Sequence, residues 1–213
     1  MAVDKGGVFL KPLVRKEMNQ YFDGYGNGRD RSKYNKNLDV SKLDITPETE
    51  DGTLTFRASI RSEYQRDEKR SKGNANINHR SSKSLKFINY LVTVRFHKVT
   101  FSEEKTPEFD KTWEDTWDDT YSKAPSIAAN PAMIRCQCRD FMMTWEKWLA
   151  EKGGLWPDNK WTKYRRKTKF NPMQKPHPVY NPPYRNPDEK MGYCKHVETL
   201  LNHLYNEDMI KNG

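Results

Sequence analysis

The three cysteines of this 213-residue chain fall in two short motifs with the same internal spacing. Cys136 and Cys138 form a Cys-x-Cys pair in IRCQCRDF, and Cys194 and His196 form a Cys-x-His pair in GYCKHV. Residues i and i+2 of a strand project to the same face, so two ligand atoms of a pair can point in one direction. Three sulfurs and one imidazole are the ligands of a closed, tetrahedral structural zinc site. We therefore predict that Zn²⁺ binds these four residues.

The energetics of chain closure favour the same interpretation. The two pairs are separated by 55 residues, and closing such a loop costs roughly 3–4 kcal/mol of entropy. A structural zinc site contributes about 10–16 kcal/mol in small peptides. Three alternatives remain open at this stage: unrelated thiols beside a surface histidine, a strained Cys136–Cys138 disulfide, and a catalytic cysteine. That every cysteine belongs to a ligand-spaced pair favours zinc over all three.

Hydrophobic periodicity predicts a mixed fold around this centre. Residues 52–64 alternate apolar and polar side chains as a half-buried strand does, and residues 85–103 alternate with one change of phase. The phase change indicates either a long strand with a bulge or two strands. Residues 132–141 are typical of a short strand, and residues 139–154 and 195–211 of helices. The predicted fold class is α+β: a small antiparallel sheet with two helices, pinned by one structural zinc site.

Two helical features are more specific. Asp140 is the expected cap of the first helix, whose apolar stripe runs from Phe141 to Leu149. In the acidic segment 106–123, Trp113, Trp117 and Tyr121 recur every four residues, which predicts a helical stripe. The carboxylates of this segment could form a metal or catalytic site, but a run of charges more often forms a solvated surface, and we favour that interpretation.

Long extensions surround the predicted core. Residues 1–50 are predicted to form an extended N-terminal arm, and residues 51–213 a zinc-stabilised α+β domain. Within that domain, residues 154–193 hold seven of the twelve prolines, and we expect a proline-rich basic excursion that leaves the core and returns to it.

The net charge of +9 is unevenly distributed: +8 over residues 1–100, −4 over 101–135 and +5 over 136–213. Basic side chains contact phosphates and aromatic rings stack on bases, so nucleic-acid binding is an alternative function. Its candidate surface is the basic-aromatic part of the excursion: Lys160, Lys163, Tyr164, Arg165, Arg166, Lys167 and Lys169. Basic residues of 66–72 are candidates to extend it.

Several functional classes find no support in the sequence. No apolar run is long enough for a transmembrane helix, and the first residues lack the apolar core of a secretory signal. Residues 196–198 spell the His-x-Glu that opens the zinc-deaminase signature, but no Pro-Cys-x-x-Cys follows. We expect no enzymatic activity, no membrane association and no small-molecule substrate.

The Cys-x-Cys…Cys-x-His pattern, with a helix after the last pair, resembles the SWIM-type zinc finger. The interval between the two pairs is longer here than in that family. The resemblance implies a module that binds DNA or protein, without catalysis. With PPYRNP before GYCKH, the chain is also similar to SWIM-like proteins of tailed bacteriophages. That likeness implies a non-enzymatic structural or adaptor protein of the virion, in its tail, neck or baseplate. Its expected partners are other protein subunits of a larger assembly, and its expected location is the virion or the host cytoplasm.

Overall fold

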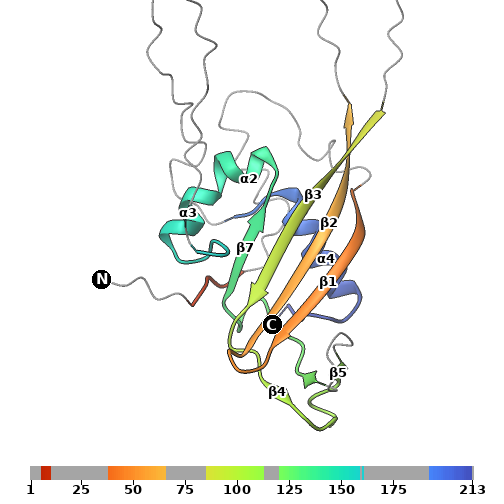
Figure 1. Cartoon of the computed structure of the whole chain (residues 1–213), viewed down its shortest axis with the longest axis vertical. Coiled ribbons are helices and arrows are strands. Elements are labelled where there is room, and N and C mark those ends of the chain that lie inside the picture. The colour runs from red at the N-terminus through yellow and green to blue at the C-terminus, as the bar shows by residue number, and fades with distance from the viewer. Residues whose placement is uncertain are drawn as a thin grey trace, which may run out of the picture.

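The computed structural model describes residues 6–10, 38–65, 85–112, 120–158, 160 and 192–212. Its main element is an antiparallel sheet of four strands in the order β1-β2-β3-β7 (Figure 1). The strands are β1 (Leu38–Glu48), β2 (Thr53–Gln65), β3 (Leu85–Phe96) and β7 (Ala132–Cys136). The α+β class and the antiparallel pairing are confirmed.

One face of this sheet forms the hydrophobic core. The inward side chains of β2 and β3 include Phe56 and Val94, which lie opposite each other and are fully buried. Their alternation follows from the period of two along a strand, as predicted. Helix α4 (Lys195–Asn206) covers this face and buries Leu200 and Leu204 against it (Figure 1). The other face of β1 to β3 carries no helix among the described elements.

The phase change in residues 85–103 corresponds to two strands. β3 ends at Phe96, and β4 (Phe101–Ser102) belongs to a second, three-stranded sheet of order β4-β6-β5. Between them Lys98 has a positive φ of 58°, which turns the chain out of the first sheet. No bulge interrupts β3. A register shift occurs instead in β1, between Val40 and Lys42.

The second sheet corrects one prediction. Its other strands are β5 (Lys111–Thr112) and β6 (Tyr121–Ser122), both within the segment for which a helical stripe was predicted. Tyr121 lies in a strand that pairs on both sides, so it cannot belong to such a stripe. The spacing was misleading because strand pairing, a non-local interaction, determines the conformation here. Residues 113–119 lie outside the described part of the chain.

The helix predicted after Cys138 is also different in detail. It is divided at Trp145 into α2 (Arg139–Thr144) and α3 (Glu146–Glu151). The N-cap of α2 is Cys138, whose sulfur accepts a hydrogen bond from the backbone N–H of Phe141. The expected cap, Asp140, is therefore inside the helix, within its first turn. The described chain thus has three helices, α2, α3 and α4, where two were predicted.

The N-terminal segment is not wholly an arm. Residues 38–48, predicted as part of the arm, form strand β1. Val8 exchanges two backbone hydrogen bonds with Ala132 of β7, and Leu10 is buried. Gly7 has φ +81°, and a Cβ there would lie 2.8 Å from the backbone of Ala132, so the position requires glycine.

Residues 154–156 complete the outer edge of β7. Ile134 bridges Leu155 in parallel, with backbone hydrogen bonds from Ile134 to Gly154 and from Trp156 to Ile134. Together with Val8, these residues cover an edge that would otherwise expose unpaired backbone groups. None of the helices in the described ranges is long and apolar enough to cross a membrane.

Candidate metal centre

Four potential ligands meet where β7 ends and α4 begins. Cys136 is the last residue of β7, and Cys138 caps α2. Cys194 occupies the N-cap position of α4, and His196 lies in the first turn of that helix. Their ligand atoms all lie within 4.8 Å of one another, and all four residues are buried. The structure therefore brings together every residue of the predicted zinc site.

The local backbone explains how the Cys-x-Cys pair converges. Only Cys136 belongs to the strand, whereas the prediction placed both cysteines on it. Cys138 nevertheless keeps an extended conformation, with φ −73° and ψ 148°. The backbone N–H of Gln137 still donates to the carbonyl oxygen of Leu91 on β3. The side chains at i and i+2 thus remain on one face, although regular pairing has ended.

The distances fit a tetrahedral ion. His196 Nδ1 lies 3.9 Å from the sulfur of Cys136 and 3.9 Å from that of Cys194. With zinc–sulfur bonds of about 2.3 Å and zinc–nitrogen bonds of about 2.1 Å, adjacent ligands of a tetrahedron are about 3.6 Å apart. Nδ1 is therefore the histidine nitrogen that faces the site.

Backbone donors stabilise negative charge on the sulfurs. The N–H of Cys138 donates to the sulfur of Cys136 at 3.4 Å, and the N–H of Phe141 donates to the sulfur of Cys138 at 3.3 Å. Cys194 lies at the N-terminus of α4, where the helix dipole favours a thiolate. The three thiols are free, so the Cys136–Cys138 disulfide is excluded.

The thiols strongly affect one another's ionisation. Hydrogen bonds from Cys136 and Cys194 lower the pKa of Cys138 well below its ordinary value. The hydrogen bond to Cys138 raises the pKa of Cys136, and burial raises that of Cys194. Three thiolates this close repel one another unless a cation lies between them. Zinc or a similar thiophilic cation fits this donor set and would hold all three sulfurs as thiolates.

Tyr90, which no sequence motif marks, contacts the imidazole of His196. The rings of Tyr90 and His196 have centroids 4.4 Å apart and are inclined at 42°. Tyr90 lies on the core-facing side of β3, opposite Ile60, so the strand alternation was the only signal available. His196 Nε2 is buried and finds no hydrogen-bond partner among the described residues.

Both ends of the proline-rich excursion are fixed beside the centre. At the exit, Arg135 donates to the carbonyl oxygen of Trp156 at 2.9 Å and pairs with Glu146 at 2.8 Å. At the return, Gly192 lies against the indole ring of Trp145. The contacts among these five residues join segments that are separate in the sequence, so no local pattern predicts them.

The candidate nucleic-acid residues are mostly outside the described chain. Lys160 is described and exposed, and its ammonium group lies 3.1 Å from the carboxylate of Asp158. A hydrogen bond from Lys160 lowers the pKa of Asp158. The other six candidates fall within residues 161–191, so nucleic-acid binding by this segment stays a prediction.

Comparison of the chain with protein-family models, with curated proteins and with solved structures gave no match. The structure itself supports a buried Cys3His group that could hold a metal ion.

Proposed function

We propose that the chain is a non-enzymatic structural or adaptor protein, completed by one zinc ion bound to Cys136, Cys138, Cys194 and His196. The observation that carries the proposal is the convergence of four buried ligand atoms within 4.8 Å, from two segments distant in sequence. An ion there would join β7, α2 and α4, and would fix both ends of the excursion.

The composition of the centre supports a structural role over a catalytic one. Four protein ligands fill a tetrahedral zinc, so no position remains for a water molecule or a substrate. Catalytic zinc sites in proteins usually have three protein ligands and an open position. The functional surfaces we propose are therefore those that the centre holds in place, which contact other subunits of a larger assembly. We propose that this assembly is the virion of a tailed phage. The only basis for that part of the proposal is the resemblance in ligand pattern to SWIM-like phage proteins.

Two histidines of α4 allow a matched test of the centre. His196 and His203 lie on the same helix, and only His196 belongs to the ligand group. We expect the purified chain to carry one equivalent of zinc by elemental analysis. His196→Ala should lose that zinc, whereas His203→Ala should keep it. Equal zinc content in the two variants would refute the proposed ligand set.

A nucleic-acid function remains the alternative, and salt dependence tests it. Binding through the basic excursion would neutralise several phosphates and would weaken steeply as salt rises. Replacement of Arg165 and Arg166 by glutamine should then reduce the salt dependence of duplex binding. If no duplex or single strand binds even at low salt, the alternative fails, and the structural proposal is unaffected.

A further inference from the structure

Two consecutive residues of β3 contact the two ligand pairs of the metal centre. The carbonyl oxygen of Leu91 accepts a hydrogen bond of 3.2 Å from the backbone N–H of Gln137, the residue between the two ligand cysteines. Tyr90 contacts the other pair, through the imidazole ring of His196. A main-chain bond therefore holds the Cys-x-Cys pair on β3, whereas a side chain connects β3 to the Cys-x-His pair.

The imidazole of His196 lacks the hydrogen bond that usually orients a histidine ligand. Such a ligand binds the metal through one ring nitrogen and donates the N–H of the other to a carboxylate, a carbonyl oxygen or water. Nδ1 of His196 faces the sulfurs, so Nε2 carries the hydrogen when a metal is bound. The residue is only 3% exposed, and Nε2 has no hydrogen-bond partner among the described residues. A contact of another kind is needed to orient the ring.

The ring of Tyr90 is placed to supply that contact. Its centroid lies 4.4 Å from that of the imidazole, and the two rings are inclined at 42°. Rotation of the imidazole about its Cβ–Cγ bond would move an edge of that ring toward Tyr90, so the contact restrains the rotation. A bound metal also withdraws electron density from the imidazole, and the π electrons of a neighbouring aromatic ring attract such a positively polarised group.

We propose that Tyr90 is a positioning residue of the metal centre: its ring holds the imidazole of His196 with Nδ1 directed at the three sulfurs. Its support is rigid, because β3 is an inner strand that pairs with β2 on one side and with β7 on the other. Helix α4, which carries the imidazole, packs against the same sheet (Figure 1). The inference rests on the proposed zinc site and adds to it a residue outside the ligand set.

Substitutions of Tyr90 separate the effect of its ring from that of its bulk. Tyr90→Phe keeps the ring and should bind zinc as tightly as the wild type in competition with a chromophoric chelator. Tyr90→Leu and Tyr90→Met lack the ring and should bind zinc about 10- to 100-fold more weakly, the usual effect of losing a group that orients a ligand. Phe56→Leu is the control, because Phe56 is a fully buried ring of the same core whose aromatic neighbour is Phe96. It should lower the free energy of unfolding without lowering zinc affinity.

Cobalt substitution provides a second measurement, which reports the geometry of the ligands. The visible absorption bands of Co²⁺ in a tetrahedral site depend on the position of each ligand atom. We expect Tyr90→Leu and Tyr90→Met to change these bands, and Tyr90→Phe and Phe56→Leu to leave them as they are in the wild type. Loss of core packing alone would not produce that division among the four variants.

Three outcomes would overturn the inference. Zinc affinity and cobalt spectra that are the same in Tyr90→Leu and the wild type would show that the ring does not position His196, although the zinc site itself would stand. Equal losses of affinity in Tyr90→Leu and Phe56→Leu would assign the effect to core packing. A wild type that binds no metal would refute the proposed function, and with it this inference. Circular dichroism of each variant confirms that folded proteins are compared.

Discussion

The indole ring of Trp145 occupies the space beside Gly192 that a side chain would need. A Cβ at residue 192 would lie 2.6 Å from two carbons of the six-membered ring, closer than real Cβ contacts come. Gly192 is two residues before the ligand Cys194, and Trp145 is the residue at which α2 and α3 meet. The contact therefore fixes the returning chain against the helical pair beside the metal centre.

This contact predicts a coupled pair of mutations. Gly192→Ala should destabilise the protein by about 1–3 kcal/mol, because a methyl group is forced into a filled space. Phenylalanine lacks the ring carbons that would clash, so Trp145→Phe should provide room. We expect the double variant to be more stable than the sum of the two single costs implies, as measured by denaturant unfolding. Strict additivity would show that the two residues are not in contact.

A second prediction concerns the buried carboxylate of Glu146, which is only 1% exposed and pairs with Arg135 at 2.8 Å. Arg135→Met removes the cation that pairs with this buried carboxylate, which should cost about 3–5 kcal/mol. Arg135→Met/Glu146→Met should recover much of the lost stability, because two methionine side chains leave no buried charge that must be paired. Lys42→Met is the control: its exposed pair with Asp44 should contribute less than about 0.5 kcal/mol. Equal losses for Arg135→Met and Lys42→Met would contradict the prediction.

The elements of the fold were predictable where the apolar pattern within a single segment determines the structure. In β2, Leu54, Phe56, Ala58 and Ile60 alternate without interruption and all face the core, so the period of two was sufficient. The ligand set was predictable for the same reason, since each pair is defined by its own i, i+2 spacing.

Strand β1 shows why other elements were missed. Its inward side chains, including Leu43 and Ile45, are only half-buried, and the register shift between Val40 and Lys42 breaks the alternation. Its conformation depends on pairing with β2, which is a non-local interaction. The contacts of Tyr90 with His196 and of Trp145 with Gly192 likewise exist only after distant segments have come together.

Removal of the metal should increase hydrogen exchange only in the segments that surround the centre. The centre joins the end of β7 to the first turns of α2 and α4, whereas β1 pairs with residues 53–62 of β2 without it. With a zinc chelator, we expect amides of residues 138–142 and 194–198 to exchange faster by hydrogen-exchange mass spectrometry. Central amides of β2, around Phe56, should keep most of their protection. Uniform loss of protection throughout the chain would show instead that zinc is required for the entire fold.

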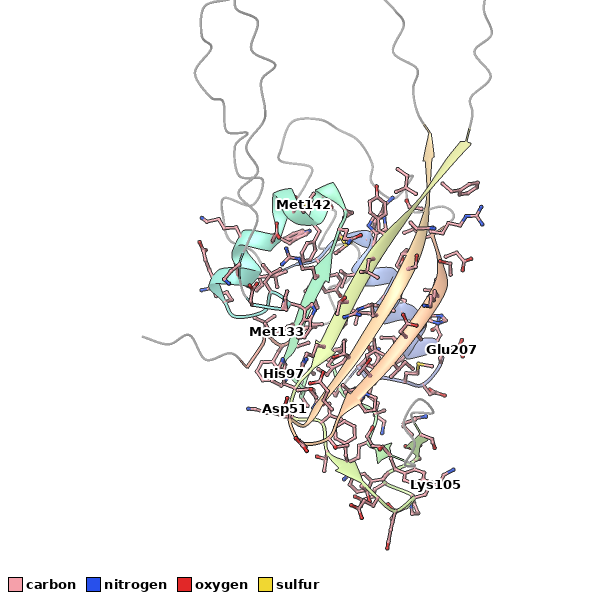
Figure 2. All side chains as sticks on the ribbon, viewed as in Figure 1. Asp51, His97, Lys105, Met133, Met142 and Glu207 are labelled. Carbon is pink, nitrogen blue, oxygen red and sulfur yellow. The ribbon has the colours of Figure 1, made fainter. Side chains whose placement is uncertain are left out.

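The imidazole of His97 gives a prediction for pH. Figure 2 shows His97 near Asp51 at the lower end of the sheet. Burial lowers the pKa of His97 below 6.5, and the positive charge of Arg95 lowers it further, against the smaller opposing effects of Glu48 and Asp51. Between the folded pKa and 6.5, the unfolded chain binds more protons than the folded one. Stability from this group is therefore present at neutral pH and is lost as the pH falls below 6.5.

His97→Gln removes this dependence while keeping a polar side chain of similar length. The difference in unfolding free energy between wild type and variant should therefore shrink, or change sign in favour of the variant, as the pH is lowered from about 7 to about 5. Comparing the two proteins at each pH removes the effect of acid on the metal centre, because both retain the same ligands. The measurement is denaturant unfolding across that range. A difference independent of pH would mean that the folded and unfolded states protonate His97 equally, and that burial does not oppose its charge.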